Sequence, residues 1–99
     1  MLCAVIGTPV RGLPRKQARE YTTLLQQWKP PAGYDMKALY FGTAGTVVAI
    51  VDIQTSAAAY EAAMPWTGWE WKIIPVVGPP EDLQIEERVR AWADKVLGG

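Results

Sequence analysis

Residues 36–53, MKALYFGTAGTVVAIVDI, carry the clearest strand signal in the chain. Two apolar runs are joined by the short connection TAG, a pattern typical of a β-hairpin. The second run places apolar side chains on both faces of its strand, Val47, Ala49, Val51 and Ile53 on one face against Val48 and Ile50 on the other. The hairpin therefore predicts a sheet that is apolar on both faces.

The segments before this hairpin predict a strand followed by a helix. LCAVIGTPV indicates a first strand over residues 2–8, and apolar residues on both of its faces favour a central position in the sheet. A helix should open at Pro14 and stop before KPPAG, because proline suits a first helical turn but not a helix interior. Its apolar stripe, at spacings of three and four residues, consists of Ala18, Tyr21, Leu25 and Trp28.

The segments after the hairpin predict a helix, a strand and a last helix. AAAYEAAM is a short helix that Thr55 or Ser56 can cap. WEWKIIPVV is a strand, and its Pro75 fits an edge position or a bulge. The last helix has an acidic first turn, a favourable Glu86–Arg90 pair and an apolar stripe of Ile85, Val89, Trp92 and Val96.

The first six elements follow the ferredoxin-like order βαββαβ, an antiparallel α+β sheet with two helices on one face. We expect one domain over residues 1–99, with residues 80–97 as a C-terminal helical extension. The second sheet face is also apolar, and a soluble monomer does not leave such a face in water. A second copy of the same sheet is the expected cover, which predicts a homodimer through the sheet face.

Residues 28–77 resemble the small dimeric α+β barrel proteins, and most closely an uncharacterised bacterial domain-of-unknown-function family in that superfamily. The similar features are the PPAG turn, the glycine-bearing hairpin, a strand ending at Asp52, the helix of Tyr60, Trp66 after it, and IIPVV. The resemblance implies a barrel closed by two subunits, with a ligand cleft in each between sheet and helices. The final helix departs from the shortest members of that family. The superfamily includes cofactor-free oxygenases, cyclases, isomerases, haem-degrading enzymes and members without known activity.

Composition excludes several kinds of chemistry. The chain has no histidine and one cysteine, so the usual zinc ligand sets, Ser-His-Asp and Cys-His catalysis and histidine ligation of haem do not apply. We therefore predict no metal and no cofactor. Ten basic and ten acidic residues balance, which argues against nucleic acid as a partner. The sequence has neither a membrane span nor a signal peptide, so we expect a cytoplasmic protein that does not bind membranes.

Asp52 is the sharpest candidate for chemistry. It shares a strand face with Val48 and Ile50, and apolar neighbours would raise the pKa of its carboxyl toward the range of a general base. The alternative is a solvated carboxylate at the end of the strand. Tyr21, Tyr40 and Tyr60 are further candidates, because phenols in a cleft donate hydrogen bonds to a ligand oxygen. We assign Asp52, Tyr40 and Tyr60 to catalysis and Tyr21 to substrate binding.

The remaining binding candidates are Arg11, Trp28, Trp66 and Trp69. Arg11 follows the first strand and can bind a carboxylate at the mouth of a cleft. The alanine-rich helix either approaches the sheet closely or leaves volume beneath it, and tryptophans around that volume would make an aromatic pocket. Trp71 shares a strand face with Trp69, and we assign it to the core or the barrel seam.

Three functions remain open from the sequence. The first is a cofactor-free enzyme of oxygenase, cyclase or isomerase type that acts on a hydrophobic aromatic or polyketide-like molecule. The second is a non-catalytic dimer that binds a small molecule or a protein, and the third is a purely structural oligomer. Unfilled volume with converging polar groups would favour the first, and a sealed core with an exposed Trp92 stripe the second.

Overall fold

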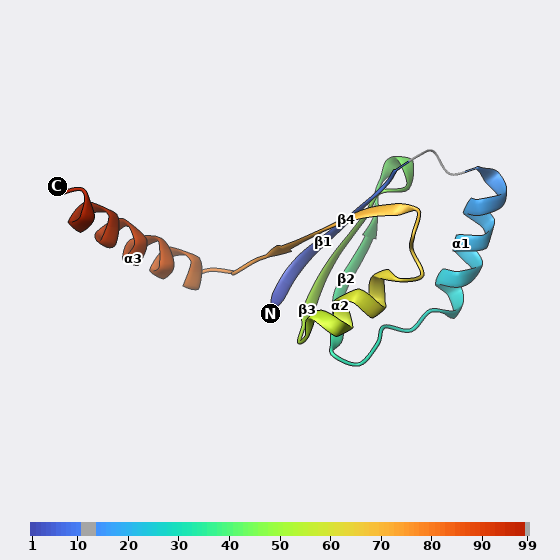
Figure 1. The fold of residues 1–99 in the computed structure, drawn as a ribbon, viewed down its shortest axis with the longest axis horizontal. Helices are drawn as coiled ribbons and strands as arrows, with labels where there is room; N and C mark the ends of the chain where they lie inside the picture. Colours follow the sequence, from blue (N-terminus) through green and yellow to red (C-terminus); the bar gives the residue numbers. More distant parts are fainter. Residues whose placement is uncertain (11–13, 99) are drawn as a thin grey trace.

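The structure is a computed structural model and describes residues 1–10 and 14–98. Its elements are β1 (Leu2–Pro9), α1 (Arg15–Gln27), β2 (Tyr34–Phe41), the 3₁₀ turn η1 (Thr43–Gly45), β3 (Val47–Ile53), α2 (Ser56–Ala63), β4 (Trp69–Pro75) and α3 (Glu81–Val96). Figure 1 shows the sheet with α1 and α2 at one end of the molecule and α3 at the other. The fold is α+β and ferredoxin-like, as the sequence predicts.

The four strands form one antiparallel sheet in the order β2-β3-β1-β4. β1 lies between β3 and β4, which confirms the central position expected from its two apolar faces. β4 is an edge strand, with no neighbouring strand on one of its two edges. A proline is tolerated in such a strand because its missing N–H can lie on the unpaired edge. The tight connection η1 places Ala44 at φ 58° and Gly45 at φ 75°, a left-handed conformation that glycine adopts readily.

β2 begins two residues earlier than the sequence pattern indicates. A register shift between Met36 and Ala38 leaves Lys37 as an extra residue in the strand. This bulge resets the alternation, so Tyr34 and Met36 share the helix-covered face with residues further along β2. A strict period of two misses this change of phase.

The core lies between the sheet and α2. Its buried residues are Cys3, Val5, Tyr34, Ala49, Val51, Ile53, Ala58 and Ala62. α2 begins at Thr55, whose side-chain oxygen accepts a hydrogen bond from the backbone nitrogen of Ala58 at 3.1 Å, so the predicted cap is confirmed. The small side chains of α2 let the helix backbone lie close to the sheet.

The other face of the sheet is not covered by any described element of this chain. The strand register brings eight apolar residues together on it, and we call them the open face: Leu2, Ala4, Ile6, Ala38, Tyr40, Val48, Ile50 and Ile74. Tyr40 is 65% exposed and Ile74 is 44% exposed. Ile6, Val48 and Ile50 are half-buried by their neighbours alone.

α3 stands away from the sheet and the other two helices (Figure 1). With α3 included, the molecule measures 60 × 28 × 21 Å. The chain leaves β4 in extended form, and the backbone nitrogen of Val76 donates to the oxygen of Leu2 at 2.9 Å. α3 contains no buried residue. The predicted Glu86–Arg90 pair is confirmed, with 2.8 Å between Oε1 and the guanidinium nitrogen.

Candidate functional site

A cavity of about 240 Å³ lies between α1, α2 and the covered face of the sheet. We call it the aromatic cavity. Its wall includes seven aromatic residues that come from α1, β2, the loops and β4: Tyr21, Trp28, Tyr34, Phe41, Trp66, Trp69 and Trp71. Aliphatic residues of the sheet and of both helices complete the lining, so the interior surface is apolar.

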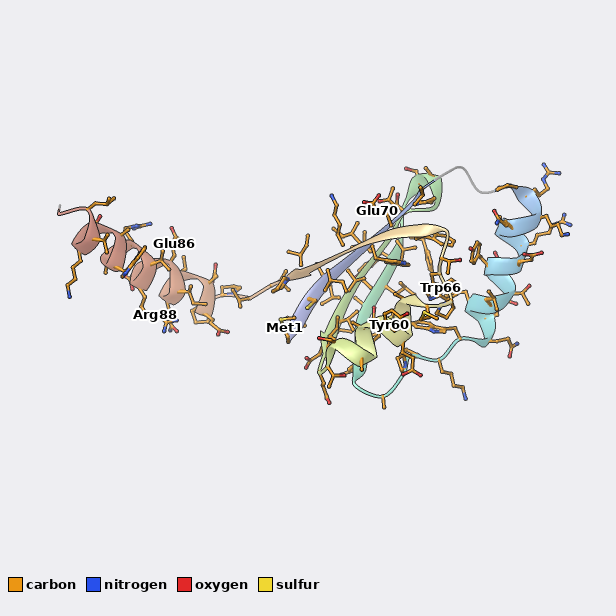
Figure 2. The ribbon with its side chains drawn as sticks, in the orientation of Figure 1. Met1, Tyr60, Trp66, Glu70, Glu86 and Arg88 are labelled. Carbon is orange, nitrogen blue, oxygen red and sulfur yellow. The ribbon has the colours of Figure 1, made fainter. Side chains whose placement is uncertain are left out.

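The aromatic side chains of α1, the loops and β4 contact one another around this space. The ring of Tyr21 meets that of Trp69 edge to face, with centroids 4.6 Å apart. Trp66 lies between α2 and α1 (Figure 2), 5.8 Å from Trp28 and 6.3 Å from Trp69 between ring centroids. Such T-shaped pairs stabilise one another beyond simple burial. They connect α1, which contains no buried residue, to the rest of the fold.

Two of the indoles are held by hydrogen bonds. The Nε1 of Trp69 donates to the backbone oxygen of Gly45 at 2.8 Å, and the Nε1 of Trp71 donates to that of Trp66 at 3.3 Å. Trp71 also lies directly over Gly7, where any Cβ would overlap its ring. Trp71 packs against the core as the sequence predicts, and it lines the cavity as well.

The alanines of α2 make the roof of the cavity. Ala59, Ala62 and Ala63 line it, while Ala58 faces the core. The sequence left two alternatives for this helix, close packing on the sheet or unfilled volume beneath it. The structure shows both, with close packing at Ala58 and unfilled volume next to Ala59 and Ala63. Larger side chains at these positions would fill the space.

The polar groups of the lining are few. No charged side chain lines the cavity among the described residues, and the side-chain hydroxyls there belong to Tyr21, Thr22 and Tyr34. Burial raises the pKa of Tyr34, and the nearby Cys3 adds to this shift. Tyr34 therefore stays protonated at neutral pH and can donate a hydrogen bond.

Four sequence-predicted binding residues come together here: Tyr21, Trp28, Trp66 and Trp69. Arg11 lies outside the described residues. Sequence reasoning missed Tyr34, although its position two residues before Met36, at the start of the apolar run, is a signal for the same strand face. It also missed Met36, Leu39 and Phe41 as wall residues, because the bulge in β2 hides their common face.

The three residues assigned to catalysis lie outside the lining of the aromatic cavity. Tyr40 is on the open face, and Tyr60 is 70% exposed. The expectation that Tyr60 is a phenol in a cleft is wrong, because α2 turns Ala58 and Ala62 toward the sheet and Tyr60, 200° around the helix from Ala58, points away.

Asp52 lies on the same side of the sheet as the open face, at the end of β3. Its carboxylate is 46% exposed and accepts a hydrogen bond from the amine of Met1 at 2.9 Å. That hydrogen bond and the charge of the amine lower the pKa of Asp52. The expected raised pKa is therefore wrong, because the carboxylate has a cationic partner and solvent rather than an apolar pocket.

Neither a metal site nor a membrane-spanning helix is found in the described part of the chain. No three His, Cys, Asp or Glu side chains gather closely enough there to hold a metal ion. None of the helices in residues 1–10 and 14–98 has the length and hydrophobicity needed to cross a bilayer.

The fold and the cavity define a class of protein: a small ferredoxin-like α+β chain with an aromatic-walled cavity between helices and sheet. The chain belongs to the family described as Domain of unknown function (DUF3303), whose model matches residues 1–90. This match confirms the expected uncharacterised family and includes most of α3, whereas the dimeric α+β barrel stays a prediction. Comparisons with curated proteins and with solved structures find no match.

Proposed function

We propose that this protein binds one small, flat, uncharged hydrophobic molecule in the aromatic cavity. The observation that carries the proposal is a volume of about 240 Å³ walled by seven aromatic rings, with no charged side chain among the described lining residues. A dry apolar cavity of roughly 150 Å³ binds benzene. The larger volume here suits a molecule of about two fused rings.

The chemistry of the lining selects against a charged ligand. Moving an ionised group from water into apolar surroundings costs several kcal/mol or more unless it is paired. The described lining has no partner of opposite charge, but it has phenol groups at Tyr21 and Tyr34. A ligand with one carbonyl, ether or hydroxyl oxygen is therefore favoured over a purely hydrocarbon ligand or a carboxylate.

Catalysis on the same ligand is the second candidate, as an oxygenase, cyclase or isomerase without a cofactor. The titratable side chains on the described lining are those of Tyr21 and Tyr34, so a proton-transfer step would use one of these phenols. Asp52 is on the opposite side of the sheet and carries a lowered pKa, which makes it a poor general base for such a ligand. This placement favours binding over catalysis.

A titration with 2-naphthol and 2-naphthoate tests the binding proposal. Both ligands have two fused rings, but only naphthoate is an anion at pH 7. We expect saturable quenching of tryptophan emission by 2-naphthol and at least tenfold weaker binding of naphthoate, because the described lining cannot neutralise its charge.

Two variants of α2 provide the matched controls. Ala59→Phe places a ring in the cavity and should abolish 2-naphthol binding, whereas Ala57→Phe adds the same ring at an exposed position of the same helix and should not. Equal binding by both variants, or equal affinity for the neutral and anionic ligands, would contradict a site in this cavity.

A further inference from the structure

Two apolar surfaces have no partner within the described chain. One is the open face of the sheet. The other is the stripe of α3, formed by Ile85, Val89, Trp92 and Val96, which fall within about 60° of one another around the helix. Trp92 is 64% exposed and Val89 is 55% exposed, and with Ile85 and Arg88 they border a shallow hollow on the helix. A contiguous exposed apolar stripe of this kind marks an interaction site.

The connection between β4 and α3 directs the helix away from its own sheet. Residues 75–80 contain Pro75, Pro79 and Pro80, and proline-rich segments act as semi-rigid, extended spacers. The chain continues the line of β4 past the end of the sheet before α3 begins (Figure 1). Folding back onto its own open face would require a full reversal within Val77 and Gly78.

We propose that α3 is an exchange arm, and that its stripe docks on the open face of a second copy of this chain. Two copies related by a two-fold axis each supply one arm and one open face, so both apolar surfaces are covered at once. The dimensions agree, because a 16-residue helix is about 24 Å long and strands of seven to eight residues span a similar length.

The area available meets the lower limit for a specific interface. Full burial of an indole removes roughly 150–250 Å² from water, and full burial of a Val or Ile side chain removes roughly 60–120 Å². Val89, Trp92 and Val96 are 55%, 64% and 62% exposed in the single chain, so one stripe supplies on the order of 250 Å². With the sheet surface it covers, and with two arms, the exchange buries on the order of 1,000 Å², the smallest area expected of a specific interface.

The charges agree with docking of α3 on the body of another copy. α3 has five acidic and three basic residues, and the rest of the chain has five acidic and seven basic residues. Pairing of two α3 helices is disfavoured. The antiparallel register that stacks all four stripe residues places Arg88 beside Lys95 of the second copy, and a parallel register places Glu81 beside Glu86.

Exposed positions on opposite sides of α3 allow a matched comparison. Sedimentation of the wild-type chain should give a species of twice 10.9 kDa. Trp92→Ala should weaken the dimer at least thirtyfold, because a central tryptophan is a typical hot spot. Leu83→Ala removes an equally exposed apolar side chain from the other side of α3 and should leave assembly unchanged. A wild-type monomer, or equal effects of both substitutions, would overturn the proposal.

Cross-linking identifies the surface that the arm occupies. A chain with Trp92→Cys is mixed with a separate chain carrying Ile50→Cys, oxidised, and the disulfide-linked peptides are identified by mass spectrometry. Exchange predicts a link between positions 92 and 50 of different chains, and none when Leu83→Cys replaces Trp92→Cys. A 50–50 link without the 92–50 link would show two sheets packed face to face instead. That result would overturn arm exchange. The absence of any link would also overturn it, as would a 92–50 link that forms only within a single chain carrying both substitutions.

Discussion

At the scale of single residues, Tyr34 joins the core to the cavity. Its side chain is 9% exposed, and burial together with Cys3 raises the pKa of its phenol. In the unfolded chain this phenol loses its proton near pH 10. The folded chain then holds more protons than the unfolded chain, so the free energy of unfolding falls as pH rises above about 10.

Replacement of Tyr34 by phenylalanine removes this proton linkage. Urea midpoints measured between pH 8 and pH 11 should fall more steeply above pH 10 for the wild type than for Tyr34→Phe. Tyr60→Phe, a change at a 70% exposed phenol, should follow the wild type. Parallel curves for the wild type and Tyr34→Phe would mean that Tyr34 is not held in an apolar site.

The sequence allowed four wall residues to be predicted, because Tyr21 and Trp28 follow helical spacing and Trp66 and Trp69 flank the start of a strand. It did not allow the environment of Asp52 to be predicted. That carboxylate shares a strand face with apolar residues, but its pKa depends on the amine of Met1, which lies far away in sequence and is brought close by the pairing of β1 with β3.

At the scale of elements, α1 and the sheet are held by different kinds of contact. Trp71 packs against the core and over Gly7, so Trp71→Ala should cost about 3–5 kcal/mol of unfolding free energy. Trp66 instead joins Tyr21 and Trp28 of the α1 region, with centroids 6.1 Å and 5.8 Å away. Trp66→Ala should cost much less and should mainly loosen α1.

Hydrogen exchange read by mass spectrometry separates these effects. In Trp66→Ala, peptides of α1 should exchange faster while peptides of β1 and β3 keep their protection. In Trp71→Ala, the strands should lose protection as well. Equal thermal melts of the two variants, with the same exchange pattern, would mean that the two tryptophans have the same structural role.

Element types and order follow from periodicity, prolines and caps, and the structure confirms them. The bulge at Lys37 could not be predicted, because an extra residue in a strand leaves no mark on composition and appears only in the pairing of β2 with β3. The separation of α3 from the sheet was equally hidden. Its stripe predicts a helix that needs a partner surface, but not whether this surface belongs to its own chain.

At the scale of the whole molecule, the two faces of the sheet have different roles in this account. The covered face and the two helices line the aromatic cavity, and the open face is available to a second copy. The fold class could be predicted because it depends on local patterns repeated along the chain. The cavity depends on how far α1 lies from the sheet. That separation is set by packing between several elements, so it cannot be deduced from any single segment of the sequence.

The five tryptophan indoles allow the most direct measurement of the central claim, that the aromatic cavity binds a small flat molecule. Each indole N–H gives one signal in a ¹H–¹⁵N correlation spectrum, and Trp92 on α3 serves as an internal control outside the cavity. On titration with 2-naphthol, the signals of Trp28, Trp66, Trp69 and Trp71 should shift together with one saturation curve, while that of Trp92 stays in place. Unchanged spectra, or a shift confined to Trp92, would contradict a binding site in the cavity.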